Sequence, residues 1–201
     1  MAASEKSAYL FLSLLQARVG SSVVSRLREL APAAVLEMPS GELAARMKMT
    51  ERAVRVLEDL RRDFDPRAVH ESLSRRGISM LTLDDAGYPE RLKEIPDPPP
   101  ALFVNGSVPG TTAVALVGSR KASATGIETA RTLGRALGES GVCVVSGLAL
   151  GVDGAAHEGA LEAGGPTVGV LGCGIDVTLP SGYKPSSLST PFISRSPFGC
   201  T

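Results

Sequence analysis

The chain of 201 residues contains 21 basic and 21 acidic side chains, and 43% of its residues are hydrophobic. The balanced charge excludes a basic footprint over the whole chain, so any anion-binding surface must be local. Aromatic residues make up 4% of the chain, which excludes a stacking platform for many bases. The cysteines, Cys143, Cys173 and Cys200, lack metal-ligand spacing, and a reducing, cytoplasmic setting is expected.

Residues 1–62 carry apolar side chains at helical spacing and predict a small all-helical domain, in which Pro32 stops one of the runs. The stretch Ala8–Leu15 resembles the core of a signal peptide, but no basic segment precedes it, so a packed helix is predicted instead. Thr50 is the expected N-cap of the last helix in this domain. No stretch of the sequence has the length of a membrane span.

Residues 42–60 fit two interpretations. In a helix-turn-helix regulator, Arg52 and Arg55 of the second helix would read DNA. In an ordinary helical bundle, the apolar side chains of both helices would pack together. The bundle is favoured because any short helical hairpin has this apolar spacing, and the regulator is kept as an alternative function.

Residues 63–112 are predicted to form a linker and entry strands. Ile78–Leu83 has the composition of a strand, and Leu102–Val104 is expected to be a short edge strand that ends in the turn Asn105–Gly106. The prolines at positions 96, 98, 99 and 100 exclude regular structure between these two segments.

From residue 113 the pattern changes to alternating strands and helices, which predicts a Rossmann-like α/β domain with a parallel sheet over residues 113–184. The predicted elements are the buried strands Val114–Val117, Val142–Val145 and Val168–Leu171, a helix Gly126–Gly138, and a helix capped by Asp153 that runs to Ala163. Each strand is followed by a glycine, namely Gly118, Gly147 and Gly172. In a parallel sheet these ends meet at one edge, where such domains bind ligands.

The first strand runs into Gly-Ser-Arg-Lys, which suits an anion. Backbone amides near Gly118 and the guanidinium of Arg120 can donate hydrogen bonds to phosphate oxygens. The dinucleotide pattern G-x-G-x-x-G and the Walker A loop are both absent from the sequence. A nucleotide-phosphate enzyme of Rossmann-like fold is therefore the alternative rather than the first interpretation.

Ser146, Asp153 and His157 occur in the order found in some hydrolases. No G-x-S-x-G elbow surrounds Ser146, and Asp153 and His157 lie one turn apart on the same predicted helix. No catalytic residue is predicted from this set.

Four stretches resemble the DNA-processing protein A (DprA or Smf) family: LTLDDAGYPERLKEIPDPPPALFVNG, ALVGSRKASATG, VVSGLALGVDGAAHEGALEAGG and VLGCGIDVTLP. The resemblance covers residues 1–184, and the helical N-terminus is similar to the SAM-like or helix-hairpin-helix module of that family. It implies single-stranded DNA binding in natural transformation and loading of the RecA recombinase, without catalysis. No cofactor and no metal are predicted. Single-stranded DNA and RecA are thus the expected partners, a second copy of the chain is a further candidate, and no membrane is implied.

The resemblance also implies which residues contact DNA. These are Gly118, Ser119, Arg120 and Lys121 after the first strand, Ser146 and Gly147 after the second, and Lys184 after the third. The sequence departs from the family at Leu150, where the family usually has Lys or Arg. It departs again over residues 185–201, which are expected to be a disordered tail, with no strand after Leu171.

Overall fold

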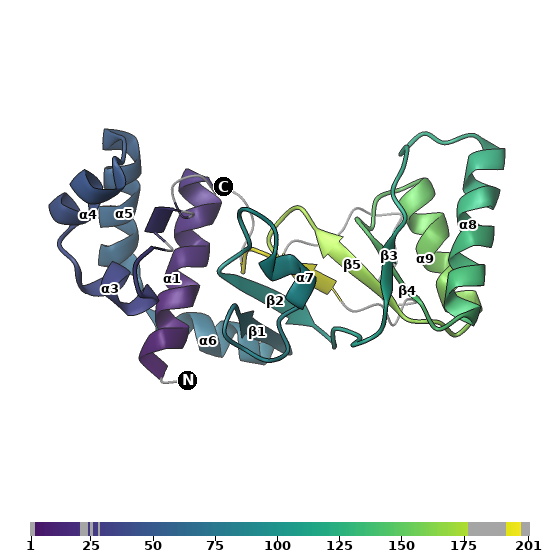
Figure 1. The fold of residues 1–201 in the computed structure, drawn as a ribbon, viewed down its shortest axis with the longest axis horizontal. Helices are drawn as coiled ribbons and strands as arrows, with labels where there is room; N and C mark the ends of the chain where they lie inside the picture. The colour runs from purple at the N-terminus through teal and green to yellow at the C-terminus, as the bar shows by residue number, and fades with distance from the viewer. Residues whose placement is uncertain (1–2, 21–23, 25, 28, 177–191, 198–201) are drawn as a thin grey trace. The chain divides into compact units, whose positions relative to one another are not determined.

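The computed structural model describes residues 3–20, 24, 26–27, 29–176 and 192–197 (Figure 1). It divides into two compact units. The first comprises Met1–Phe103 with Arg195–Thr201, and the second comprises Val104–Ser194. In the part of the chain that is described, no helix combines the length and apolar character needed to traverse a lipid bilayer.

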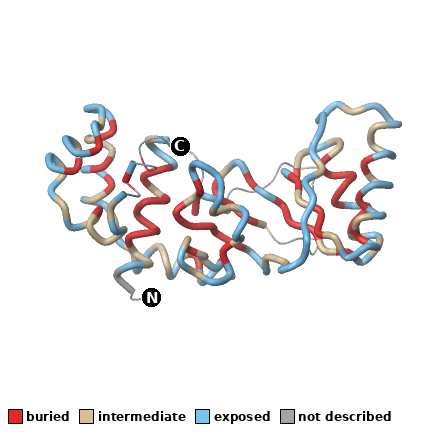
Figure 2. The backbone as a smooth tube through the Cα atoms, viewed as in Figure 1, coloured by how far each residue is buried: buried red, intermediate tan, exposed pale blue. Residues whose placement is uncertain are grey.

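The first unit contains a bundle of helices, as the apolar spacing predicts. Its helices are α1 (Ala3–Val19), α3 (Pro32–Glu37), α4 (Ser40–Met47), α5 (Glu51–Asp63) and α6 (Pro66–Arg75). The stretch that resembles a signal peptide lies within α1, where Phe11 and Leu15 are fully buried in the core of the unit (Figure 2). The prediction of a packed helix is therefore confirmed.

The helix starts follow local capping chemistry. The Thr50 hydroxyl accepts a hydrogen bond from the backbone N–H of Ala53 at 3.3 Å, which confirms it as the N-cap of α5. Asp65 caps α6 in the same way, and Pro66 occupies its first turn, so a helix lies within the predicted linker. Pro32, which was expected to stop a helix, also begins one, namely α3.

The first unit also contains the strand β1 (Ile78–Thr82), the short helix α7 (Glu90–Lys93) and the first three residues of the strand β2 (Ala101–Asn105). β1 and β2 are neighbours in the sheet. β2 is not a terminal strand in the order of the sheet, and its residues 101–104 are all buried, so the expectation of a short edge strand is wrong.

The second unit is a parallel α/β layer, which confirms the predicted fold class. Its elements are β3 (Ala113–Ala115), α8 (Ala124–Glu139), β4 (Cys143–Ser146), α9 (Val152–Glu162), β5 (Thr167–Leu171) and β6 (Phe192–Ser194). β3 pairs with β4, β4 with β5 and β5 with β6, each time in parallel. Both helices pack against β4, where Val144 is fully buried against Ala156 and Ala160 (Figure 1).

β6 corrects one expectation from the sequence. Residues 192–194 pair with β5 in parallel register, with Ile193 opposite Val170. The expectation that strands end at Leu171 is wrong, because residues 192–194 of the expected tail form a strand. Residues 185–191 and 198–201 of that tail lie outside the described residues. Ile193 is buried and fits an apolar parallel sheet, a role that its proline- and serine-rich surroundings conceal.

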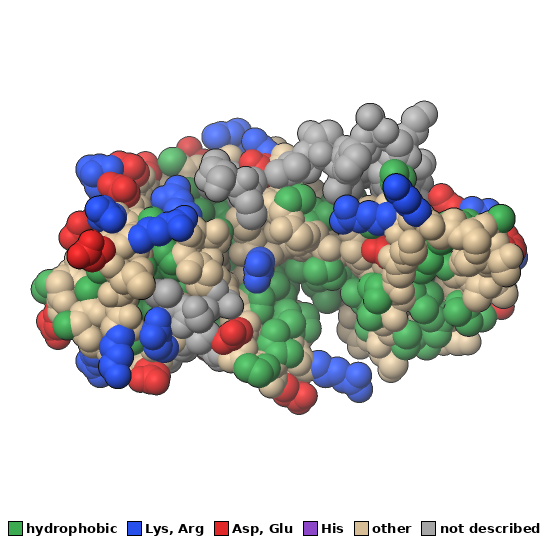
Figure 3. Space-filling view, turned by 90° about the horizontal axis from the view of Figure 1, so that it is seen from above, with side chains coloured by type: hydrophobic (Ala, Val, Ile, Leu, Met, Phe, Trp, Pro, Cys, Tyr) green, Lys and Arg blue, Asp and Glu red, His purple; other side chains and the backbone are tan. Residues whose placement is uncertain are grey.

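β3 is the least buried strand of the second unit. Its residues are all exposed, although the sequence predicted a buried strand. Val117, just beyond it, is 71% exposed, and Figure 3 shows apolar side chains at the surface of this unit. An uninterrupted apolar run predicts burial on both faces, and here nothing among the described residues covers β3 in that way.

Candidate functional site

Two loops meet at the carboxyl edge of the parallel sheet. The first loop (residues 116–123) follows β3, and the second loop (residues 147–151) follows β4. Because Ala115 lies opposite Val145 in parallel register, the loops leave neighbouring strands side by side. The prediction that Gly118 and Gly147 share one edge is therefore confirmed.

Buried polar contacts hold the start of the two loops together. The hydroxyl of Ser146, 2% exposed, donates to the backbone carbonyl of Leu116 at 2.5 Å. Leu116 in turn donates its N–H to the carbonyl of Val145 at 3.0 Å. Ser146, which the family resemblance placed among DNA contacts, thus has its hydroxyl committed to the first loop.

Asp153 does not cap its own helix. Gly151 is the N-cap of α9, and the prediction that Asp153 caps this helix is wrong. Its carboxylate instead accepts hydrogen bonds from the N–H groups of Gly118 at 3.2 Å and Gly147 at 3.1 Å. Sequence analysis missed this role, because the contact joins residues 35 positions apart and depends on the sheet register.

The first loop presents the cations of the site. Arg120 and Lys121 are exposed, and the N–H of Lys121 donates to the Ser119 hydroxyl at 3.1 Å. Among the residues that the structure describes, neither cationic side chain has an acidic partner. Ser123 then caps α8 by accepting from the N–H of Gly126 at 3.2 Å, which fixes where the loop ends.

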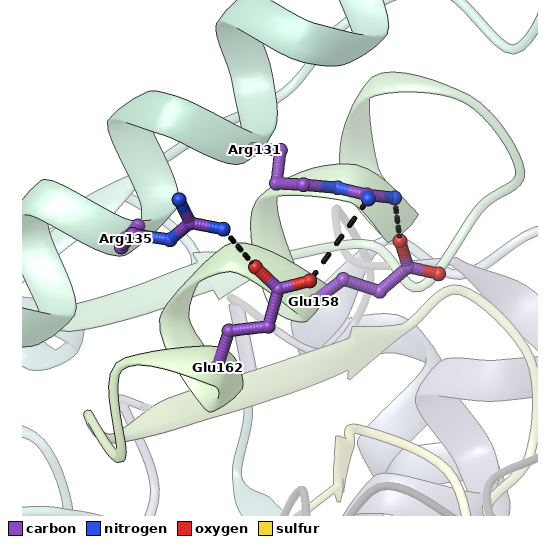
Figure 4. A network of polar contacts seen from close by, with 4 residues as sticks. All are labelled: Arg131, Arg135, Glu158 and Glu162. Carbon is purple, nitrogen blue, oxygen red and sulfur yellow. Dashed lines mark hydrogen bonds and ion pairs between the residues drawn. The ribbon is translucent and has the colours of Figure 1, made fainter.

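The arginines of α8 form a network with glutamates of α9 (Figure 4). Arg131 pairs with Glu158 at 2.5 Å and with Glu162 at 3.9 Å, and Arg135 pairs with Glu162. The hydrogen bond from Arg135 lowers the pKa of Glu162, and the same contact raises the pKa of Arg135. These two arginines are neutralised within the unit.

The hydrolase-like set is not assembled as a catalytic triad. The Ser146 hydroxyl is bonded to Leu116, and the Asp153 carboxylate is bonded to two backbone amides. His157 is fully buried with its Nδ1 2.5 Å from the hydroxyl of Thr167. Burial lowers the pKa of His157 to about 4, although the nearby negative charge of Asp153 acts in the opposite direction.

The remaining predicted residues have different outcomes. Lys184 lies outside the described residues. Leu150 is 57% exposed in the second loop. Cys143 is buried, and burial raises the pKa of its thiol, as expected for a core residue. Over the described residues, no group of His, Cys, Asp and Glu side chains could hold a metal ion.

The helices α4 and α5 match the bundle interpretation of residues 42–60. Leu43 and Leu57 are fully buried in the core of the first unit, while Arg52 and Arg55 are exposed. Arg61 joins the end of α5 to α3 and α4, because its guanidinium donates to the carbonyls of Val35 and Met38 and to the hydroxyl of Ser40.

Comparison with known proteins gives a consistent family. The family model described as DNA recombination-mediator protein A matches residues 79–188. Protein Smf of Synechocystis is 37% identical over 129 residues, which are 60% of this chain and 32% of that protein. DNA processing protein DprA of Streptococcus pneumoniae is 43% identical over 108 residues, which are 53% of this chain and 38% of that protein.

Two solved structures resemble the fold. DNA processing protein A of S. pneumoniae matches with a TM-score of 0.73 at 28% identity, over 94% of this chain and 67% of that one. DNA processing protein A of Helicobacter pylori, described with its single-stranded DNA binding mode, matches with a TM-score of 0.50 at 27% identity, over 58% and 55% of the two chains. The chain spans about a third of the length of the curated relatives named above.

Proposed function

We propose, on the premise that this chain belongs to the DNA recombination-mediator protein A family, that its first and second loops bind single-stranded DNA without catalysing a reaction. The observation that carries the proposal is the distribution of charge. Among the described residues of the second unit, Arg120 and Lys121 are the cations without an acidic partner, and both lie in the first loop.

Several features support a phosphate backbone as the ligand. Arg120 can donate two parallel hydrogen bonds to one phosphate, and Lys121 adds a point charge beside it. The loops occupy the carboxyl edge of a parallel sheet, the usual ligand position in this architecture. The related protein of H. pylori is described with a single-stranded DNA binding mode.

The absence of catalysis is proposed from how the polar side chains are used. A nucleophile needs a base within hydrogen-bond reach and an orienting group behind that base. Ser146 donates to a backbone carbonyl, and His157 is neutral and buried against Thr167. Neither is placed to attack a bound phosphate ester.

The experiment is a titration of a fluorescein-labelled oligothymidylate with the chain, followed by anisotropy at several salt concentrations. Two phosphate contacts predict that log K falls with log salt at a slope of roughly −1.4, since each contact on a single strand contributes about −0.7. Unlabelled duplex should compete more weakly than single strand. Preference for a particular duplex sequence would instead favour the helix-turn-helix regulator, in which the exposed arginines of α5 read DNA.

Membership of a recombination-mediator family supports a further role, in which the DNA-bound chain assists loading of RecA during natural transformation. RecA filament growth on DNA coated with single-strand binding protein measures this directly. The chain should shorten the lag before filament growth. A variant in which Arg120 and Lys121 of the first loop are both replaced by alanine should not shorten it. If the chain is bound to the DNA and the lag is unchanged, the proposed role in RecA loading is wrong, while the proposed DNA binding still stands.

A further inference from the structure

The backbone amides of Gly118 and Gly147, at the centre of the site, already donate hydrogen bonds to a carboxylate of the chain itself. The Asp153 carboxylate receives the N–H of Gly118 on one oxygen and the N–H of Gly147 on the other. Asp153 is 7% exposed, while both glycines are exposed. One buried side chain on α9 therefore joins the start of the first loop to the start of the second.

The surrounding backbone is shaped for this contact. A Cβ on Gly147 would lie 2.9 Å from Oδ2 of Asp153, and a Cβ on Gly118 would lie 2.8 Å from the side chain of Val152. The N–H of Val152 also donates to the carbonyl of Ser119 at 3.2 Å. The first turn of α9 thus contacts the first loop through both backbone and side chains.

This arrangement has a chemical consequence for the ligand. Glycine-rich loops usually bind phosphate with backbone amides like those of Gly118 and Gly147. Here these amides are satisfied by a carboxylate, whose negative charge also repels a phosphate from the same position. A DNA phosphate must therefore lie farther out, near Arg120 and Lys121.

We propose that Asp153 is the positioning residue of the DNA-binding loops: its carboxylate takes the place of a phosphate in the amide cradle and holds the first loop in its binding conformation. This inference rests on the proposed function. It assigns a role to a buried acid within a site for an anionic ligand, where an unneeded negative charge would weaken binding.

The test compares Asp153→Asn and Asp153→Ala with the parent chain in the oligothymidylate titration. Both variants should bind roughly tenfold more weakly, as expected for the loss of hydrogen bonds to a charged acceptor. A purely electrostatic effect predicts the opposite sign, because a negative charge is removed. Glu139→Gln makes the same charge change at the far end of α8 and should leave affinity within twofold of the parent.

Chemical rescue separates positioning from general damage to the fold. Sodium formate should restore binding by Asp153→Ala, because formate can occupy the vacated carboxylate position, whereas sodium chloride at the same ionic strength should not. Asp153→Asn retains most of the side-chain volume and should not respond to formate. Unchanged or tighter binding by both variants, or failure of formate to restore Asp153→Ala, would overturn the inference.

Amide NMR keeps the inference distinct from the function on which it rests. The amide protons of Gly118 and Gly147 should shift upfield and exchange faster in Asp153→Asn, with or without DNA. If the parent chain does not bind DNA, the proposed function fails. The amide signals still test whether the Asp153 carboxylate holds Gly118 and Gly147. Unchanged signals at both glycines would show that Asp153 does not hold them.

Discussion

The Nδ1 atom of His157 lies 2.5 Å from the hydroxyl oxygen of Thr167 inside the second unit. The Thr167 hydroxyl donates to the carbonyl of Val144 at 2.8 Å, so it accepts from the histidine N–H. This contact joins α9 to β5, and through Val144 to β4. The ring is neutral at pH 7 because burial lowers the pKa of His157 to about 4.

The lowered pKa predicts acid sensitivity. Between about pH 6.5 and pH 4 the unfolded chain binds a proton at this histidine and the folded chain does not, so stability is lost as the pH falls through that window. The full shift corresponds to roughly 3 kcal/mol, which is completely lost once the pH lies below about 4. Urea unfolding at pH 7 and at pH 4.5 measures the loss.

Matched histidine variants assign this effect. His157→Gln should lose a large part of the difference between the two pH values, whereas His70→Gln should retain it. The sequence contains these two histidines. Equal pH dependence in the parent and His157→Gln would show that the buried ring does not resist protonation.

Close packing of α8 on α9 predicts a severe effect of one methyl group. A Cβ on Gly134 would lie 2.2 Å from the carbonyl oxygen of Ala156, so Gly134→Ala must push the helices apart. We expect a loss of about 3 kcal/mol in the free energy of unfolding, measured in urea. Gly126→Ala is the control in the same helix, since its nearest contact is 3.4 Å, and it should be neutral or stabilising. Equal stability of the two variants would contradict the close approach.

Leu150→Lys should strengthen DNA binding. The side chain is exposed in the second loop, at the position where the family resemblance implies a cation. One more neutralised phosphate should steepen the salt slope by about 0.7 on a single strand. Leu133→Lys adds the same charge at another exposed apolar position, on α8. A slope that changes equally in both variants would mean that the second loop has no special place in the site.

The periodic spacing of apolar residues and the distance between successive strands were sufficient to predict the parallel α/β layer. They also predicted the common edge that brings Gly118 and Gly147 together. The contact of Asp153 could not be predicted, because an acid at the start of a helix ordinarily caps that helix. The exposure of β3 was also not predicted, because an apolar stretch of sequence does not show which elements, if any, pack against the two faces of the strand. β6 escaped detection because three residues among serines and prolines form a strand only through their pairing with β5.

The measurement that tests the account most directly compares single-stranded DNA binding by Arg120→Ala and Arg131→Ala. Arg120 has no acidic partner among the described residues, whereas Arg131 is paired with Glu158 and Glu162. Loss of one charge-assisted phosphate contact should weaken binding by Arg120→Ala roughly tenfold or more and flatten its salt dependence. Arg131→Ala should bind close to the parent level. Equal affinity of Arg120→Ala and the parent chain, or a larger loss in Arg131→Ala, would contradict DNA binding at the first loop.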